Sequence, residues 1–264
     1  MTLLRRGAGV LLAVSALQAA PALAFQPLIT DDTGTQGAGG NQLEFASNWQ
    51  ELKSEGDTTK TDTLALVFTR GITDALDIYA GVSHGQVRSS NPTYEAHGHS
   101  NPVLGLKWRL YENEDKKFGV AVKPEIQFGA PADYERLGLG NGHSGYSGLI
   151  IFSQETNFGA LHINYGFTLV NYALESNRTD HRRKLHRLSL APVFDVGAGW
   201  KLGIDLGLTT NSHRTERATM GYAELGAIWS PSEDLDFALG AIRFVGDGEL
   251  RSHTLTAGVT WRFR

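Results

Sequence analysis

The chain has 264 residues, a formal charge of −4 and no cysteine, so disulfide bonds cannot hold it together. Beyond the N-terminal residues, no stretch approaches the run of about 18 apolar residues that marks a transmembrane helix, which excludes a helical membrane protein. The mean hydropathy of −0.22 fits a soluble protein, but it equally fits a barrel that is apolar outside and polar inside.

Residues 1–24 have the composition of a secretory signal peptide. Arg5 and Arg6 form a basic start, an apolar run follows, and the segment ends in Ala-Pro-Ala-Leu-Ala, the small-residue pattern of a cleavage site. We predict cleavage before Phe25 and export of the remaining chain. Without the two arginines, the 24 basic residues fall to 22 against 28 acidic ones, a formal charge of −6, which argues against nucleic acid as a partner.

Residues 25–40 are predicted to form an irregular or extended N-terminal segment, because they show no hydrophobic period and are rich in glycine. Asp31 and Asp32 stand out within it. They could form an Asx-type turn, coordinate a cation, or lie at the periplasmic mouth of a barrel and pair with Arg262 or Arg264. We expect Asp31, Asp32 and Arg262 at that mouth.

From residue 41 to the C-terminus, apolar and polar residues alternate along segments of similar length. In the last segment, Leu255, Val259 and Trp261 fall on one face of an extended strand and Thr256 and Thr260 on the other, because successive side chains of a strand point to opposite sides. We predict twelve strands, at residues 41–53, 59–70, 76–88, 101–111, 117–129, 145–155, 160–172, 184–195, 199–211, 217–229, 235–246 and 251–263.

The connections favour a membrane barrel over a soluble sandwich. After the first strand every second connection is tight, as at residues 71–75, whereas others are long, as at residues 130–144. Short turns on one rim and long loops on the other are typical of outer-membrane barrels. Apolar side chains fill barrels of about eight strands, so the apolar face of a wider barrel must face lipid. We predict an all-β fold, a closed antiparallel transmembrane β-barrel of about 12 strands over residues 41–264.

The polar face of the predicted strands carries charges of both signs. These residues could pair with one another as structural bridges, line a transport path, or do both. Aromatic residues are expected to anchor the barrel at the membrane interface. The predicted lumen-lining residues are Glu44, Lys107, Arg109, Lys123, Glu125, Lys201, Asp205 and Glu224, and the predicted anchors include Trp49, Trp200, Trp229, Trp261 and Phe263.

Two stretches resemble a known family. Residues 26–37, Gln-Pro-Leu-Ile-Thr-Asp-Asp-Thr-Gly-Thr-Gln-Gly, followed by Asn-Gln-Leu-Glu at residues 41–44, are similar to the opening of the outer-membrane transporter family associated with the meta-pathway of phenol degradation. The turn at residues 70–77 is similar to a strand-turn-strand element of that family. The resemblance implies an outer-membrane barrel on the scale of twelve strands that passes small hydrophobic or aromatic compounds, and it implies no catalytic residues.

The C-terminal residues carry a second resemblance. Gly258, Trp261 and Phe263, in the order Gly-Val-Thr-Trp-Arg-Phe, resemble the signal that the barrel-assembly machinery reads at the end of outer-membrane proteins. Arg264 departs from that pattern, because the last aromatic residue usually ends the chain.

We therefore predict an outer-membrane channel or transporter of a Gram-negative cell for passive passage of small, hydrophobic or aromatic solutes, without enzymatic activity, cofactor or metal. Its expected partners are outer-membrane lipid and lipopolysaccharide, the barrel-assembly machinery and the solute. One alternative is a structural or adhesive barrel without transport. A less favoured one is a barrel hydrolase that would combine Ser189 with His162 or His186, although no local motif supports it.

Two polar clusters fall in predicted outer loops. His97 and His99, with His84 nearby, form only a weak metal signal, because an isolated His-x-His lacks a placed third ligand. The basic run at residues 178–187 could bind lipopolysaccharide phosphates or attract anions to the pore. It could equally be a solvated loop that neighbouring acidic residues balance.

Overall fold

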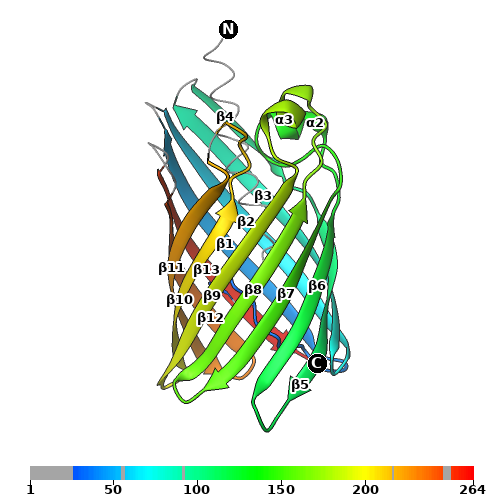
Figure 1. The fold of residues 1–264 in the computed structure, drawn as a ribbon, viewed down its shortest axis with the longest axis vertical. Helices are drawn as coiled ribbons and strands as arrows, with labels where there is room; N and C mark the ends of the chain where they lie inside the picture. The colour runs from blue at the N-terminus through cyan, green and yellow to red at the C-terminus, as the bar shows by residue number, and fades with distance from the viewer. Residues whose placement is uncertain (1–25, 55–56, 91–92, 216, 246–250) are drawn as a thin grey trace.

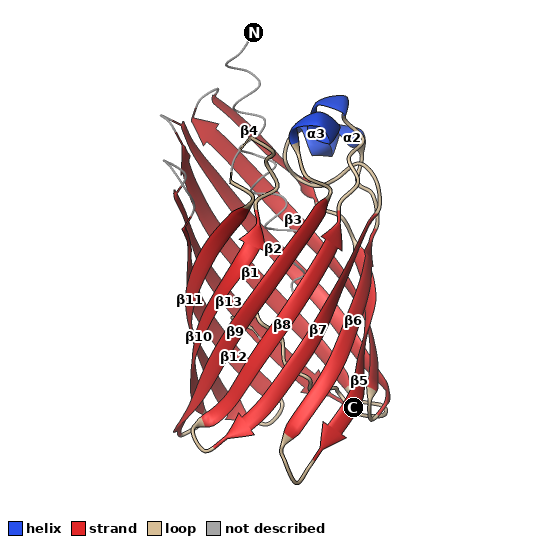
Figure 2. Ribbon diagram, viewed as in Figure 1, coloured by secondary structure: helices blue, strands red, loops and turns tan. Residues whose placement is uncertain are grey.

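The structure, a computed structural model, describes residues 26–54, 57–90, 93–215, 217–245 and 251–264. The predicted signal peptide and its cleavage site lie outside the described residues. The described chain forms one closed antiparallel β-barrel with two short helices at one end (Figures 1 and 2). Neither of these helices is long and apolar enough to span a membrane.

Within the described residues, thirteen strands form a single sheet that closes on itself. β1 pairs with β2 and with β13, and β2 pairs with β3. β4 and β5 both pair with β3, one above the other, and residues 100–102 separate them, so the two together occupy one position in the barrel. The predicted closed barrel of about 12 strands is therefore confirmed. The strands are β1 (Asn41–Ser54), β2 (Asp57–Thr73), β3 (Leu76–Ser90), β4 (Thr93–His99), β5 (Val103–Asn113), β6 (Phe118–Gln127), β7 (Gly145–Thr156), β8 (Gly159–Leu169), β9 (Lys184–Gly197), β10 (Trp200–Thr210), β11 (Thr219–Ser232), β12 (Leu235–Val245) and β13 (Arg251–Phe263).

Side chains alternate between outward apolar and inward polar positions. On β3, Ile78 and Val82 point outward and are 44% and 54% exposed, whereas Asp77 and Tyr79 are buried inside. A soluble protein buries its large apolar side chains and leaves few of them in contiguous exposed patches. A belt of exposed apolar residues around a polar interior fits a barrel whose outer surface contacts lipid.

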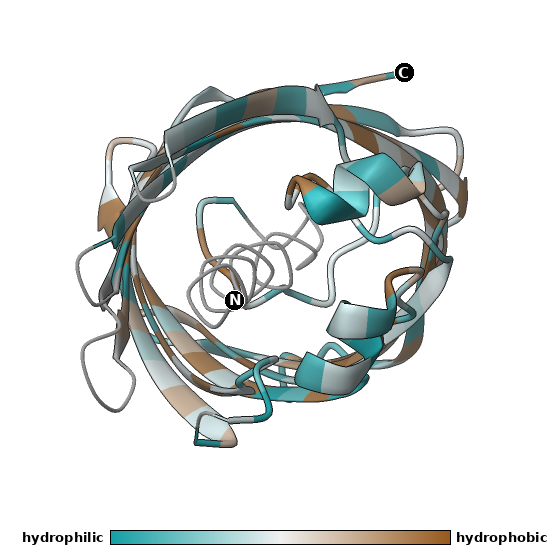
Figure 3. Cartoon of the chain, turned by 90° about the horizontal axis from the view of Figure 1, so that it is seen from above, coloured by the Kyte–Doolittle hydropathy of each residue, from teal (hydrophilic) through white to brown (hydrophobic). Residues whose placement is uncertain are grey.

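The two rims of the barrel differ. The short-turn rim carries brief connections, such as those at residues 157–158 and 198–199, and the C-terminus (Figure 1). The long-loop rim carries β4 and the helices α2 (Ala132–Arg136) and α3 (Glu175–Asp180). Seen from above, both helices lie inside the outline of the strand ring, over the lumen (Figure 3).

Aromatic side chains gather at the short-turn rim. The rings of Trp200 and Trp229 stack with centroids 6.1 Å apart, and those of Trp261 and Phe263 with centroids 4.6 Å apart. Tryptophan and other aromatic residues favour the interface between lipid and water. The predicted anchor Trp49 lies farther along β1, away from this rim.

The long connections of the long-loop rim contain regular secondary structure. Residues 93–99, predicted as loop, form β4 and extend the wall, because Val87 and Ala96 pack against Leu139 on its inner side. The loops of α2 and α3 are joined by the buried carboxylate of Glu135, which accepts hydrogen bonds from both loops. Its donors are Gly142 N (2.6 Å), Ala173 N (2.8 Å), Leu174 N (3.0 Å) and Asn177 Nδ2 (2.7 Å).

Candidate functional site

Residues 26–40, here called the inner segment, lie inside the barrel. The segment enters at the short-turn rim, where Gly39 N donates to Gly71 O (3.0 Å) and Gly71 N to Gly40 O (2.9 Å). From there it follows the inner wall, and Leu28 and Thr30 are almost completely buried. The N-terminal segment that we predicted as irregular is thus without regular secondary structure but firmly placed.

The wall holds the inner segment through its backbone. Unpaired buried N–H groups are costly, and here inward side chains from five strands of the barrel accept them in place of a neighbouring strand. The segment therefore binds around the lumen rather than to one strand. The bonds are Gln36 N to Asp77 Oδ1 on β3 (3.1 Å), Thr33 N to Ser153 Oγ on β7 (3.0 Å), Asp31 N to Asn164 Oδ1 on β8 (2.7 Å), Thr30 N to Asp205 Oδ2 on β10 (2.6 Å) and Ile29 N to Glu224 Oε2 on β11 (3.0 Å).

Two lysines of the wall pair with the two aspartates of the inner segment. Lys107 Nζ lies 3.0 Å from Asp31 Oδ1 and 3.1 Å from Asp32 Oδ1, and Lys123 Nζ lies 2.6 Å from Asp31 Oδ2. The side chain of Lys123 is 4% exposed and that of Asp31 3%. Hydrogen bonds between lysine and a carboxylate are charge-assisted and therefore strong, and the bond between Lys123 and Asp31 is also shielded from water.

Of the alternatives for Asp31 and Asp32, the pairing with Arg262 is not formed. Arg262 lies at the short-turn rim and pairs with Asp236 at 2.6 Å, whereas the inner segment carries the aspartates to the level of the lysines. The Asx-type turn is present, since Gly34 N donates to Asp32 Oδ1 at 2.6 Å. A turn and an ion pair therefore share one carboxylate.

The environment of Asp32 favours its charged form. Burial raises the pKa of this carboxyl, but the charges of Lys107 and His162 and the hydrogen bonds from Lys107 and Gly34 outweigh it and lower the pKa to about 2. Asp32 therefore stays ionised, and paired with Lys107, over the whole physiological pH range.

Inward glycines make room for the start of the inner segment. A Cβ atom at Gly203 would lie 2.7 Å from Leu28 Cδ1, one at Gly226 2.7 Å from Pro27 Cγ, and one at Gly240 3.0 Å from Pro27 Cβ. These glycines lie on three consecutive strands, β10 to β12. Glycine within a strand often marks the close approach of another part of the chain, which is the case here.

The remaining predicted lumen residues fall into two groups. Glu44 and Glu125 are buried on the inner wall, and Glu125 accepts hydrogen bonds from neighbouring side chains of the wall. Arg109 and Lys201 lie toward the short-turn rim, where Lys201 is exposed and Arg109 Nη2 donates to Asp74 O at 2.9 Å. The donors to Glu125 are Tyr79 Oη (3.1 Å), Gln127 Nε2 (3.2 Å) and Ser147 Oγ (3.2 Å).

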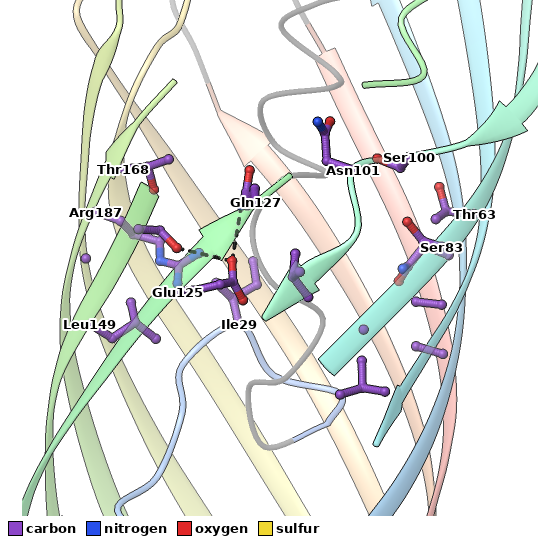
Figure 4. Close-up of a pocket in the computed structure, with 18 of the residues that line it drawn as sticks. Ile29, Thr63, Ser83, Ser100, Asn101, Glu125, Gln127, Leu149, Thr168 and Arg187 are labelled. Carbon is purple, nitrogen blue, oxygen red and sulfur yellow. Dashed lines mark hydrogen bonds between the residues drawn. The ribbon is translucent and has the colours of Figure 1, made fainter. Parts of the chain in front are cut away.

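A cavity of about 240 Å³ lies between the inner segment and the long-loop rim (Figure 4). Its floor includes Leu28 and Ile29 of the inner segment, and Asn141 of the α2 loop lines its upper part. The wall between them combines apolar side chains with polar and charged ones. It includes Leu149, Tyr222, Phe244, Thr168, Glu125 and Arg187.

The residues proposed for a hydrolase are not brought together. Ser189 Oγ accepts a hydrogen bond from Thr30 Oγ1 at 2.7 Å, and His186 is exposed and bonds to Tyr165. His162 Nδ1 lies 2.8 Å from Ser153 Oγ, but that serine also accepts the N–H of Thr33, so the inner segment covers the pair.

The histidine cluster lies outside the lumen, and the basic run lies at the long-loop rim except for Arg187, which lines the cavity. His84, His97 and His99 point outward from the β3–β4 hairpin, and the rings of His84 and His99 are 5.2 Å apart. Among the described residues there is no group of three or more acidic, histidine or cysteine side chains suited to a metal ion. In the basic run, Arg182 Nη1 donates to Asn211 O at 2.9 Å, so part of the run is tied to the next loop.

Some residues that hold the inner segment were not among the predicted lumen residues. Ser153 and Asn164 were missed because charge was the selecting feature, and Asp77 because it was assigned to the turn element at residues 70–77. The strand alternation alone puts all three on the polar face. The inward glycines gave a further signal. Strand alternation combined with the spacing of the glycines could have indicated that something packs against the inner wall. It could not have indicated which segment of the chain does so.

Comparison with known proteins identifies the fold. No family model and no curated protein sequence matches the chain. Among solved structures, an outer membrane channel from Pseudomonas putida F1 matches with a TM-score of 0.71 and 14% identity over 88% of this chain and 98% of that one. The NanC porin matches with a TM-score of 0.57 and 11% identity over 82% and 98%.

An autotransporter domain has a similar fold. The translocator domain of NalP from Neisseria meningitidis matches with a TM-score of 0.53 and 11% identity over 88% of this chain and 91% of that one. At these identities the similarity establishes the barrel architecture alone. The choice between the functions that such barrels serve therefore rests on the interior of this one.

Proposed function

We propose that this protein is an outer-membrane channel for the passive passage of small solutes. The observation that carries the proposal is the cavity between the inner segment and the long-loop rim, enclosed by a barrel with an apolar outer belt. The predicted signal peptide and the similarity to an outer membrane channel and a porin support the same location and activity.

The inner segment sets the size of solute that such a channel admits. It crosses the inner wall from β3 to β11 through backbone hydrogen bonds, and it thereby narrows the lumen on the short-turn side of the cavity. A narrowed lumen favours small solutes over oligosaccharides or polypeptides. Passage then runs beside the inner segment or requires its partial displacement.

The composition of the cavity wall favours apolar or aromatic solutes. Leu149 and Ile242 offer aliphatic surface, and the rings of Tyr222 and Phe244, 5.7 Å apart, offer aromatic surface. Cavities that bind small molecules commonly combine such surfaces with a few polar groups. This composition agrees with the solute class that the family resemblance implies.

Two alternatives are less well supported. A purely structural barrel does not need an interior cavity of this kind. Side chains from opposite walls could fill its lumen instead. A hydrolase needs a nucleophile that substrate can reach, whereas Ser153 and His162 are covered by Thr33 of the inner segment. We therefore propose no enzymatic activity and no cofactor.

Assembly and lipid contacts remain proposals of the same kind. We expect Gly258, Trp261 and Phe263 to serve as the signal for the barrel-assembly machinery, and the long-loop rim to contact lipopolysaccharide. Replacing Phe263 with aspartate should reduce the folded, heat-modifiable form in outer membranes, whereas the neighbouring Arg264→Gln should not. Equal folding of both variants would contradict the assembly role.

Reconstitution tests the channel function directly. The purified protein is inserted into planar bilayers and into liposomes, and conductance and the uptake of phenol, benzyl alcohol and a disaccharide are measured. We expect discrete channel events and faster uptake of the small aromatic solutes than of the disaccharide. The absence of both conductance and uptake would refute the proposal and leave the structural barrel as the better account.

A further inference from the structure

Arg187 is a charged residue of the cavity wall whose side chain has no hydrogen-bond or ion-pair partner among the described residues. It lies on β9 two positions from Ser189, on the same inward side, between the exposed residues His186 and Leu188. Within the described part of the chain, no hydrogen bond or ion pair joins its guanidinium group to another residue, and its Nε is buried without a hydrogen-bond acceptor. A buried donor without an acceptor is costly, so an acceptor from solution is favoured there.

The other charges of the same wall are already matched. Lys123 pairs with Asp31 at 2.6 Å, and Glu125 accepts three side-chain hydrogen bonds. Asp205 interacts electrostatically with Arg187. Its two carboxylate oxygens, however, accept hydrogen bonds from Thr30 N at 2.6 Å and Tyr222 Oη at 3.0 Å. Among the described residues that line this cavity, Arg187 is thus the cation left for a ligand.

The neighbours of the Arg187 side chain are a glycine on the adjacent strand and an apolar side chain. Gly166 lies opposite Arg187 on β8, and a Cβ atom there would be 2.9 Å from Leu149 Cδ2 and 3.9 Å from Arg187 Nε. The missing side chain therefore leaves the guanidinium group beside Leu149 and facing the cavity. Tyr222 and Phe244 line the same cavity.

We propose that Arg187 binds the carboxylate of a small solute whose apolar or aromatic body packs against Leu149, Tyr222 and Phe244. Guanidinium presents paired donors that match the two oxygens of a carboxylate. The ligand class is therefore an aromatic or short aliphatic monocarboxylate, which gains a charge-assisted contact at Arg187 that a neutral aromatic solute of the same channel does not make. This inference rests on the proposed channel function and assigns its solute class.

Binding to the full barrel, purified and folded in detergent, tests the inference. Equilibrium dialysis with radiolabelled benzoate and, separately, with benzyl alcohol compares the wild type with Arg187→Gln, Arg187→Lys and Lys184→Gln. Lys184 is exposed, lies on the same strand and does not line the cavity, so it controls for net charge. Heat-modifiable migration confirms that each variant is folded.

We expect Arg187→Gln to weaken benzoate binding about tenfold, since a hydrogen bond to a charged group is lost, and Arg187→Lys to weaken it less. Lys184→Gln should bind benzoate as the wild type does, and benzyl alcohol binding should be the same in all four proteins. Equal benzoate binding by Arg187→Gln and wild type, equal weakening by Lys184→Gln, or no benzoate binding by the wild type would overturn the inference.

The two proposals fail separately. Benzoate binding that depends on Arg187, in a protein that shows no conductance or uptake, supports the carboxylate site and refutes the channel. Uptake with benzoate binding that does not depend on Arg187 refutes the carboxylate site and supports the channel.

Discussion

Two levels of the lumen differ in how the wall uses its polar groups. At the level of the inner segment, Lys107 and Lys123 form ion pairs with Asp31 and Asp32. Inward side chains of the wall accept hydrogen bonds from the backbone N–H groups of the segment. In the cavity above it, Arg187 has no partner among the described residues and the wall turns partly apolar. The comparison separates a part of the wall that binds its own chain from a part that is open to a solute.

Removing residues 27–36 should have the largest effect. Without the inner segment the level of Lys107 and Lys123 opens to water, and we expect single-channel conductance in planar bilayers to rise several-fold. Replacing the same residues with glycine and serine, which keeps the length and removes the contacts, should also raise it. Conductance equal to that of the wild type in both variants would mean that the inner segment does not narrow the lumen.

Asp31→Asn should weaken the attachment of the inner segment strongly. It leaves Lys107 and Lys123 with less compensation for their buried charges, and breaking a buried ion pair costs about 3–5 kcal/mol. We expect faster proteolysis of the inner segment in folded barrels and a higher conductance. Asp133→Asn on α2, which removes an exposed pair with Arg136, is the control and should change neither quantity.

Gly226→Val should disturb the same attachment at its other end. The new side chain would meet Pro27 Cγ at 2.7 Å and Leu28 Cδ2 at 2.8 Å, and overpacking of this kind costs about 1–3 kcal/mol. We expect intermediate proteolysis and conductance. Gly148→Val is matched to it, because nothing lies within 4 Å of a Cβ atom at Gly148. A stronger effect of Gly148→Val would argue against the packing explanation.

Asp32→Asn should have the smallest effect, with a defined pH dependence. The pKa of Asp32 is lowered from its usual range to about 2, so its ionised form stabilises the fold above about pH 4, and this contribution disappears as the pH falls toward 2. The difference in unfolding temperature between wild type and Asp32→Asn should be constant from pH 7 to pH 5 and shrink below pH 4. A difference that vanishes near pH 6 would contradict the lowered pKa.

The barrel could be predicted because its signals are local. Alternation along the last strand, residues 251–263, and turns such as residues 157–158 follow from neighbouring residues in the sequence. The order within residues 93–99 and the α2 loop was missed, since it depends on packing between segments. Alternation also indicates an inward position for Lys107 and Lys123.

The position of the inner segment could not be predicted, for a physical reason. Its contacts join residues far apart in the chain, as between Ile29 and Glu224, 195 positions apart, and the segment has no period of its own. Asp31 and Asp32 were recognised as charges that need a partner, but the sequence offered Arg262 as readily as Lys107. The path of the inner segment along the wall decides between Arg262 and Lys107 as the partner of these aspartates.

The most direct test of the inner segment's position is a disulfide bond between Thr30→Cys and Ser189→Cys. The chain has no cysteine, so this pair is unique, and the two hydroxyl oxygens it replaces are 2.7 Å apart. We expect efficient oxidation in outer membranes, seen as a mobility shift that a reductant reverses. Thr30→Cys with Leu190→Cys, which points outward, should not cross-link. Equal cross-linking of both pairs, or none in the first pair of a folded barrel, would contradict the placement of the inner segment along the inner wall.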